Sequence, residues 1–322
     1  MALSRPQPYA KIIDGVPRCP FATPESVRHG LRFMAQKGDV LEVSYPRSGT
    51  HWVQCIIQLI LNRGEPFSEY MEFRLRAPII EYRPDLPPRP TSKPLRTLCT
   101  HLPLCLEKLN PEAKYVYVAR NPWDVCVSLY HHVTSLSFYR FQDGTFDDFL
   151  EAFFTGRLPY GCYFEHLVAG YSLKDEPNIL FLTYEELQRD LRGGVLRLAS
   201  FMGENHLKDL KENPVEGQNL LDVIVKNTST DSMKKVMIFD LTKNFYPEVD
   251  ELLKNLKPST KAAHAGDAKR HELVRNGKVG QWKEYFSAEQ LQRMEAAIKE
   301  KTSGSSVMSL WSDIRADALR MC

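Results

Sequence analysis

The segment Tyr45–Trp52 carries side chains and backbone groups that could bind an oxyanion. A hydrophobic run with strand character, Val40–Ser44, precedes it, and an apolar helical pattern follows it. A turn between a strand and a helix offers unpaired backbone N–H groups and the positive end of the helix dipole. Arg47 adds a planar guanidinium with several donors. Ser48, Thr50 and His51 add further polar side chains. The segment therefore predicts a site for phosphate or a similar oxyanion.

The loop does not match the phosphate-loop pattern G-x-x-x-x-G-K-[ST]. It contains a single glycine, Gly49, and its cation precedes that glycine. From loop composition alone, an anion site and an ordinary strand-to-helix turn are alternatives of equal weight.

Three other segments place reactive or cationic side chains at the expected ends of strands or in turns. His101 follows a short strand and precedes Pro103, and Arg120 follows a clear strand. Arg275 stands in a basic, glycine-containing loop. Taken alone, each has a plain alternative: a polar residue at a strand end, a surface arginine and a solvated turn.

Alternating strand and helix patterns position these residues. They predict an α/β fold with a central parallel sheet flanked by helices, in which ligands bind at the carboxyl ends of the strands. Asn121 and Pro122 have the residue types of a helix N-cap and first turn. Pro84–Pro94 is expected to be an irregular loop or a lid, and Asp240–Arg275 to cover the site. The expected strands are Val40–Ser44, Thr97–Thr100, Lys114–Ala119 and Asn178–Thr183, and the expected helices are Thr50–Asn62, Pro122–Leu136 and Tyr184–Met202.

Bulk composition excludes several classes of protein. The 322 residues are 43% hydrophobic and 25% charged, which is typical of a globular protein of one large or two smaller domains. A formal charge of +2, from 42 basic and 40 acidic residues, argues against nucleic-acid binding. The sequence has no signal-peptide core and no run of about 18 apolar residues. Its 7 scattered cysteines form no C-x-x-C pair, which favours free thiols over disulfides or zinc and predicts a cytoplasmic protein.

Taken together, four segments resemble those of the cytosolic sulfotransferases. Tyr45–Trp52 resembles the family's 5′-phosphosulfate loop, and Cys99–Leu104 its Lys-Thr-His-Leu-Pro segment. Arg120–Ser128 matches Arg-Asn-Pro-x-Asp-x-x-x-Ser, and Val274–Lys283 resembles Arg-Lys-Gly-x-x-Gly-Asp-Trp-Lys. The resemblance covers about Gly38–Phe286 and implies one sulfotransferase domain over residues 1–322. It also implies 3′-phosphoadenosine 5′-phosphosulfate (PAPS) as co-substrate, adenosine 3′,5′-bisphosphate (PAP) as product, and no metal.

The resemblance assigns roles to individual residues. It implies that His101 is the catalytic base, that Arg47 stabilises charge on the leaving phosphate, and that Ser128 regulates this contact. Asp124 is expected to interact with the helix dipole or to orient a neighbouring group, and Trp282 is expected to pack rather than contact the ligand. The residues expected to bind the nucleotide are Arg47, Ser48, Gly49, Thr50, His51, Trp52, Arg120, Ser128, Tyr184, Thr228, Met233, Arg275, Asn276 and Gly277.

Three positions depart from the family pattern. Cys99 and Asn276 stand where lysines are usual, and Thr230 stands where an aromatic residue is usual. These departures leave a non-catalytic nucleotide-binding protein as an alternative, and a P-loop nucleotide kinase is a second. The usual dimer segment is present only as Lys283-x-x-x-Ser287-Ala288-x-x-x-Gln292, so a homodimer is a candidate assembly without defined geometry.

The expected partner is a small-molecule acceptor, with no nucleic acid and no membrane. A phenol or a catecholamine-like aromatic is the first candidate, and a steroid or an aliphatic alcohol is the alternative. The candidate residues for the acceptor pocket are Phe73, Arg74, Tyr82, Phe138, Tyr139, Phe141 and Tyr160.

Overall fold

A four-stranded parallel sheet lies at the centre of the molecule, in the strand order β4-β3-β5-β6. The computed structural model describes residues 6–83, 85–86, 95–240 and 270–322. Each predicted strand is present and its bounds differ from the prediction by at most one residue at either end. The strands are β3 (Asp39–Ser44), β4 (Arg96–Thr100), β5 (Lys114–Ala119) and β6 (Ile179–Thr183).

The strand order creates a switch point between β3 and β5. The chain passes from β3 to β4 on one side and then crosses back to β5 on the other side of β3. In open parallel sheets a ligand crevice forms at such a point, outside the carboxyl ends of the strands. The register aligns Ser44 with Val118 and Val43 with Thr100. The turns that follow β3, β4 and β5 therefore meet at one edge of the sheet.

Helices cover both faces of this sheet. Alternate residues of β5 point to opposite faces. On one face the hydroxyl of Tyr117 contacts His166 of α6 (Tyr163–Ser172). On the other face Val118 lies next to Gly49, at the start of α2 (Thr50–Leu61). Both surfaces of the strands are thereby buried, which explains their continuous hydrophobic character.

Local signals set the ends of two of the predicted helices. Asn121 caps α4 (Pro122–Ser135) by accepting a hydrogen bond from the backbone N–H of Asp124, as predicted. The prediction of one helical run over Tyr184–Met202 is wrong in detail. Asp190, with φ −141° and ψ 81°, separates α7 (Tyr184–Arg189) from α8 (Leu191–Met202) and caps α8.

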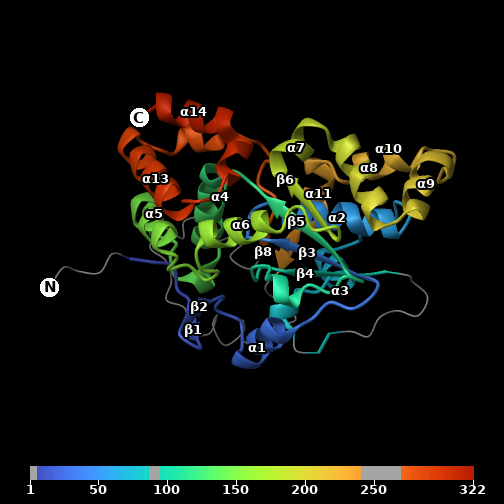
Figure 1. Cartoon of the computed structure of the whole chain (residues 1–322), viewed down its shortest axis with the longest axis horizontal. Helices are drawn as coiled ribbons and strands as arrows, with labels where there is room; N and C mark the ends of the chain where they lie inside the picture. Colours follow the sequence, from blue (N-terminus) through green and yellow to red (C-terminus); the bar gives the residue numbers. More distant parts are fainter. Residues whose placement is uncertain (1–5, 84, 87–94, 241–269) are drawn as a thin grey trace.

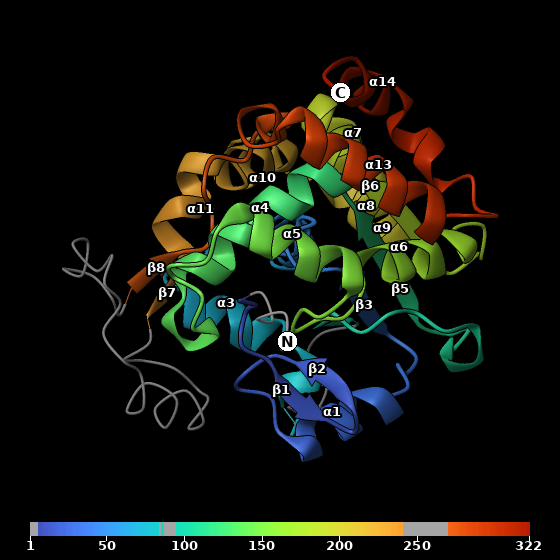
Figure 2. The ribbon, with the colours of Figure 1, turned by 90° about the vertical axis from the view of Figure 1, so that its left-hand side faces the viewer.

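The remaining elements surround this layered core. Figures 1 and 2 show the C-terminal helices at the end of the molecule opposite the N-terminal hairpin and α1. The helices are α1 (Pro24–Arg32), α3 (Tyr70–Arg76), α5 (Phe146–Thr155), α9 (Glu204–Glu212), α10 (Leu220–Asn227), α11 (Thr230–Val236), α13 (Ala288–Lys301) and α14 (Ser312–Arg320). The short 3₁₀ helices are η1 (Ile80–Tyr82), η2 (Leu106–Lys108), η3 (Ser137–Tyr139), η6 (Gln281–Glu284) and η7 (Val307–Trp311).

Two antiparallel strand pairs were not predicted. They are formed by β1 (Lys11–Ile13) with β2 (Val16–Arg18), and by β7 (Ile238–Asp240) with β8 (Arg270–Glu272). Each strand has three residues. A segment this short has too few residues for an alternating pattern to be recognised in sequence.

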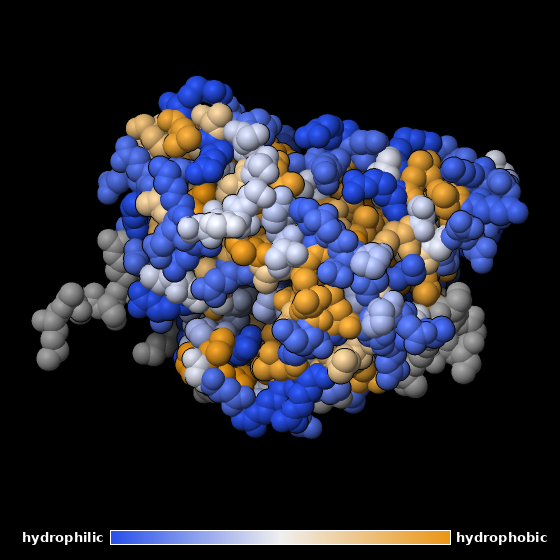
Figure 3. All heavy atoms as spheres, viewed as in Figure 1, coloured by the Kyte–Doolittle hydropathy of each residue, from blue (hydrophilic) through white to orange (hydrophobic). Residues whose placement is uncertain are grey.

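Most of the two segments expected to cover the site lies outside the described residues. Residues 84, 87–94 and 241–269 belong to this part of the chain. Among the described residues, no helix has both the length and the apolar character needed to cross a bilayer. Figure 3 shows hydrophilic residues over much of one face of the molecule, with hydrophobic patches between them. All seven cysteines are free thiols.

Candidate active site

The loop after β3 presents unpaired amide groups to a cavity. Gly49, with φ 117°, is the N-cap of α2 and has no side chain to cap the helix. The first N–H groups of a helix have no acceptor within the helix. A Cβ atom at Gly49 would lie 3.0 Å from the ring of Tyr184, so a larger residue would crowd this side of the cavity. The loop is therefore shaped for an anion at the helix N-terminus.

Two arginines, Arg47 and Arg120, lie in contact at this loop. Arg47 has a left-handed backbone (φ 72°), and its Nε donates to the Oγ of Ser128 on α4 at 3.0 Å. Arg120, at the end of β5, donates to the carbonyl oxygen of Arg47 at 3.2 Å. Burial, together with the charges of Arg120 and Arg275, lowers the pKa of Arg47 to about 10. Three cations near one another, partly shielded from solvent, favour an anionic ligand.

Asp124 holds the loop 275–282 against α4. Its carboxylate accepts from the backbone N–H of Gly280 at 2.8 Å and from that of Trp282 at 3.2 Å. Trp282 is fully buried and packs on Trp123, which confirms its predicted packing role. Arg120 also donates to the carbonyl oxygen of Lys278 at 3.1 Å. Asp124 thereby positions a loop whose first residues line the cavity.

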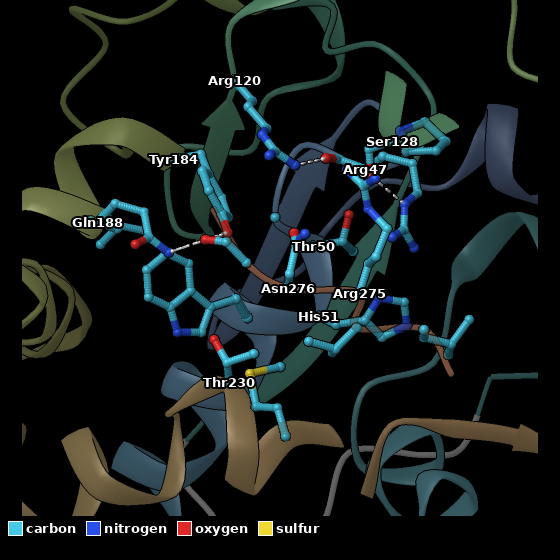
Figure 4. Close-up of a pocket in the computed structure, with 18 of the residues that line it drawn as sticks. Arg47, Thr50, His51, Arg120, Ser128, Tyr184, Gln188, Thr230, Arg275 and Asn276 are labelled. Atoms are coloured by element: carbon cyan, nitrogen blue, oxygen red, sulfur yellow. Dashed lines mark hydrogen bonds between the residues drawn. The ribbon is translucent and has the colours of Figure 1, made fainter. Parts of the chain in front are cut away.

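Aromatic groups form the opposite wall. Figure 4 shows Tyr184 and Gln188 on one side of the cavity and Arg47, Ser128 and Arg275 on the other. The hydroxyl of Tyr184 donates to the carbonyl oxygen of Gly277 at 2.7 Å, and its ring lies 4.2 Å below the guanidinium of Arg120. The rings of Trp52 and Tyr184 are 5.2 Å apart, and Trp52 Nε1 donates to the carbonyl oxygen of Thr228 at 3.1 Å. These aromatic surfaces suit a planar base.

His101 is held by two hydrogen bonds in a defined orientation. Its Nδ1 lies 2.8 Å from the carbonyl oxygen of Ser44, and its backbone N–H donates to Glu81 at 2.7 Å. Burial lowers the pKa of His101 to about 4, the charge of Arg74 acts in the same sense, and the hydrogen bond to Ser44 opposes both. The imidazole is therefore neutral at neutral pH. Because a carbonyl oxygen only accepts, Nδ1 carries the proton and Nε2 is the basic nitrogen.

The structure brings nearly all of the predicted site residues to one cavity of about 310 Å³. His101 and all the predicted nucleotide-binding residues line it, except Ser48. Ser48 is 1% exposed, and its Oγ is buried without a hydrogen-bond partner. Residues lining the cavity that sequence reasoning did not identify are Pro46, His132, Leu187, Gln188, Leu191, Ser229, Leu273 and Val274.

Of these residues, Gln188 was the one that sequence reasoning could most easily have identified. It lies one helical turn after Tyr184, on the same face of α7, and its Nε2 donates to the carbonyl oxygen of Gly277 at 2.8 Å. His132 and Leu273 lie outside the segments that match the family, so sequence reasoning had no signal for them.

A smaller cavity, of about 90 Å³, adjoins the first. Six residues line both cavities: Thr50, His51, His101, His132, Tyr160 and Leu273. The smaller cavity contains five of the residues expected in an acceptor pocket, namely Arg74, Tyr82, Phe138, Tyr139 and Tyr160. Phe73 and Phe141 do not line it. They are 0% and 2% exposed and pack in the hydrophobic core.

Two of the departures from the family pattern have structural explanations. Cys99 is fully buried in β4, lines neither cavity, and donates from Sγ to Glu42 at 3.1 Å. Thr230 packs against Gly277, where an added Cβ atom would lie 2.8 Å from Thr230 Oγ1. Asn276 lines the larger cavity, as predicted.

The fold and the cavity define an α/β protein with an anion-binding loop at the switch point of its sheet. A family model described as the sulfotransferase domain matches residues 37–306. The chain belongs to the sulfotransferase family, and it is a PAPS-dependent transferase.

Curated relatives and solved structures agree with this assignment. The chain is 30% identical to the amine sulfotransferase of Oryctolagus cuniculus, over 87% of this chain and 85% of the relative. It is 31% identical to sulfotransferase 1A1 of Bos taurus, over 95% and 97%. A mouse sulfotransferase complexed with PAP has a TM-score of 0.64 at 23% identity, covering 96% of this chain and 99% of that one, which shows the same fold.

The residues present fit an adenosine nucleotide with phosphate groups at both ends. The amides of α2 and Arg47 suit the 5′ end, and Arg120 suits a second phosphate. Tyr184 and Trp52 flank the space that a purine needs. Among the described residues, no group of three or more His, Cys, Asp or Glu side chains could hold a metal ion.

Proposed function

We propose that this sulfotransferase acts on the phenolic hydroxyl of a small aromatic acceptor. The observation that carries the proposal is the position of His101, which lies in the wall shared by the nucleotide-sized cavity and the smaller aromatic one. A base at this junction can meet an acceptor from one cavity and a sulfonyl group from the other. The smaller cavity, with its tyrosine and phenylalanine rings, suits a single ring better than a steroid.

In this proposal Nε2 of His101 takes the proton from the hydroxyl group of the acceptor substrate. The Nδ1–H of His101 remains hydrogen-bonded to the carbonyl oxygen of Ser44. When bound, PAPS supplies the sulfonyl group, and PAP remains after transfer. Arg47 stabilises the negative charge that develops on the 5′-phosphate, and Ser128 holds its guanidinium in place. Arg120 and Arg275 bind the 3′-phosphate, with Asn276 and Gly277 closing that end of the cavity.

The remaining side chains position the nucleotide. Trp52 and Tyr184 enclose the purine, and Thr228 and Met233 line the cavity near it. The amides of Gly49 and the first turn of α2 bind the 5′-phosphate, together with the side chains of Thr50 and His51, which line the cavity. Cationic and N–H groups supply the charge stabilisation, so catalysis depends mainly on positioning.

The test is a transfer assay with ³⁵S-labelled PAPS across phenols, catecholamines, steroids and primary alcohols. Labelled product is expected with small phenols and at most weakly with steroids. PAP binding without transfer to any acceptor would favour a non-catalytic nucleotide-binding protein. Efficient transfer to steroids alone would contradict the proposed acceptor class.

A further inference from the structure

Among the described residues that line the smaller cavity, one has a strongly basic side chain, Arg74 on α3. Arg74 is 7% exposed and lines the cavity together with His51, Tyr70 and His101. No aspartate or glutamate is among the described residues that line it. The rest of the wall is mainly aromatic or aliphatic, including Phe21, Tyr82, Phe138, Leu136 and Ile79.

The histidines of this wall add no charge at neutral pH. Burial lowers the pKa of His51 and that of His132 well below the ordinary value, and the pKa of His101 to about 4. The charge of Arg74 acts in the same direction on His51 and His101. Among the described residues of this wall, the guanidinium of Arg74 therefore carries the positive charge, and these histidines are neutral.

Two buried carboxyl groups lie near Arg74 but not in the cavity wall. Burial raises the pKa of Glu81 and raises that of Glu42 to about 7, and the charge of Arg74 opposes both shifts. Glu81 is already engaged, because it accepts from the backbone N–H of His101 and from the hydroxyl of Thr100. Glu42 is fully buried in β3 and accepts from the thiol of Cys99. Arg74 lines the cavity, and neither of these carboxyl groups is among the residues that line it.

A guanidinium in an aromatic wall selects among acceptors by charge. An ammonium group would meet Arg74 and find no carboxylate among the described lining residues, and like charges in a desolvated site are strongly unfavourable. A carboxylate would find a planar fork of donors that matches its geometry. In a cavity of about 90 Å³ the ligand that reaches both Arg74 and His101 is small.

We propose that the acceptor is a small hydroxyaryl acid, whose carboxylate pairs with Arg74 while its hydroxyl lies at His101. The inference rests on the proposed function and specifies its acceptor. In the transfer, the acceptor's oxygen forms a bond to sulfur and the bond from sulfur to the 5′-phosphate oxygen breaks. The hydroxyl proton passes to Nε2 of His101. Arg74 takes no part in these bonds and acts on acceptor binding.

Three acceptors with the same phenol and different side-chain charges test this proposal. They are 3-(4-hydroxyphenyl)propanoate, its neutral amide, and tyramine, and each is measured for kcat and KM at saturating PAPS. The acid is expected to have a kcat/KM roughly 30-fold above that of the amide, mainly through a lower KM. Tyramine is expected to be the poorest of the three.

Substitution of Arg74 separates the effect of its charge on acceptor binding from the effect of the shape of the cavity. Arg74→Gln should lower kcat/KM for the acid by roughly 30-fold and leave the amide within about 3-fold. Arg74→Lys should keep part of the preference, because it keeps the charge but loses the fork. Arg76→Gln is the matched control. Arg76 lies on the same helix, pairs with Glu72 and does not line the cavity.

The outcomes separate this inference from the proposed function. Absence of transfer to all three acceptors would overturn the proposed function and the inference with it. Equal kcat/KM for acid and amide, or a preference for tyramine, would overturn the inference alone, as would an equal loss for all acceptors in Arg74→Gln.

A measurement on the unmodified protein covers the case in which Arg74→Gln does not fold, shown by loss of PAP binding. The non-reacting analogue 3-phenylpropanoate should then compete with the acceptor more strongly than 3-phenylpropanamide does. Equal competition would overturn the inference.

Discussion

Arg47 and Ser128 stand 81 positions apart in sequence and are joined by a hydrogen bond of 3.0 Å from Nε to Oγ. The bond connects the loop after β3 to the second turn of α4 and fixes the direction of the guanidinium. Arg47 needs this support because its backbone is left-handed, with φ 72°, and its half-buried side chain lies near the positive charge of Arg120. This hydrogen bond explains why Ser128, which lies within α4, is part of the anion site.

Ser128→Ala removes the acceptor for Arg47 Nε and leaves the guanidinium free to turn. Because one hydrogen bond contributes about 0.5–1.5 kcal/mol net, PAP affinity should fall by roughly 2- to 12-fold. Isothermal titration calorimetry with PAP measures this loss. Ser135→Ala, at the exposed end of the same helix, is the control and should bind PAP normally. Unchanged affinity in Ser128→Ala would show that the bond does not position Arg47.

His101→Ala should lower kcat by about 10²–10⁴-fold while PAP binding is retained, since the imidazole acts on the acceptor's proton. His131→Ala is the matched control, because His131 lies on α4 and lines neither cavity. Near-normal turnover in His101→Ala would remove this residue from the role of base.

The pH dependence of the unmodified protein tests the same group independently. The base works as the neutral imidazole, and burial places its pKa at about 4. The value of kcat/KM should therefore stay level from neutral pH down to about pH 5 and fall as Nε2 is protonated near pH 4. Circular dichroism at each pH establishes that the protein is folded. A midpoint near pH 6.5 in the folded protein would contradict the buried, neutral imidazole.

Gly277 and Gly280 form a matched pair in the loop that closes the cavity. Both have positive φ, 66° and 87°, so alanine strains the backbone at either position by about 1–2 kcal/mol. Only at Gly277 would the new Cβ atom meet a neighbour, Thr230 Oγ1, at 2.8 Å, whereas at Gly280 nothing lies within 4 Å. Gly277→Ala should therefore weaken PAP binding roughly 10-fold more than Gly280→Ala does. Equal effects would mean that backbone strain alone matters.

Glu42→Gln should change how the stability of the protein depends on pH. Burial raises the pKa of Glu42 from 4.5 to about 7 in the folded state. The stability due to its neutral form is complete below about pH 4.5 and is lost as pH rises through about 7. Glutamine stays neutral, so the unfolding free energy of Glu42→Gln relative to wild type should increase between pH 5 and pH 8, by up to about 3 kcal/mol.

Urea unfolding at the two pH values measures this difference. Glu289→Gln, at an exposed position in the first turn of α13, is the control and should show little change with pH. If the difference in unfolding free energy between Glu42→Gln and wild type also changed little with pH, the result would contradict the raised pKa of the buried carboxyl group.

Local sequence was sufficient for the strands, for the cap of α4 and for the motif-bearing parts of the nucleotide cavity. Continuous hydrophobic runs specify buried parallel strands, and Asn121-Pro122 specifies a helix start, because both signals depend on neighbours in the chain. The same reasoning overestimated the helix that begins at Tyr184, since Asp190 ends one helix and caps the next. It also missed the two antiparallel strand pairs, whose three-residue strands carry no periodic signal.

By itself the sequence determined the chemistry available: a loop arginine, a strand-end histidine, and the order of segments that resembles one family. Only the tertiary structure decided which side chains share a cavity. It removed Phe73 and Phe141 from the acceptor wall, added Gln188 and His132 to the nucleotide cavity, and placed Cys99 in the core. The strand order and register decide this, because they bring the turns after β3, β4 and β5 to one edge and aim side chains distant in sequence at one space.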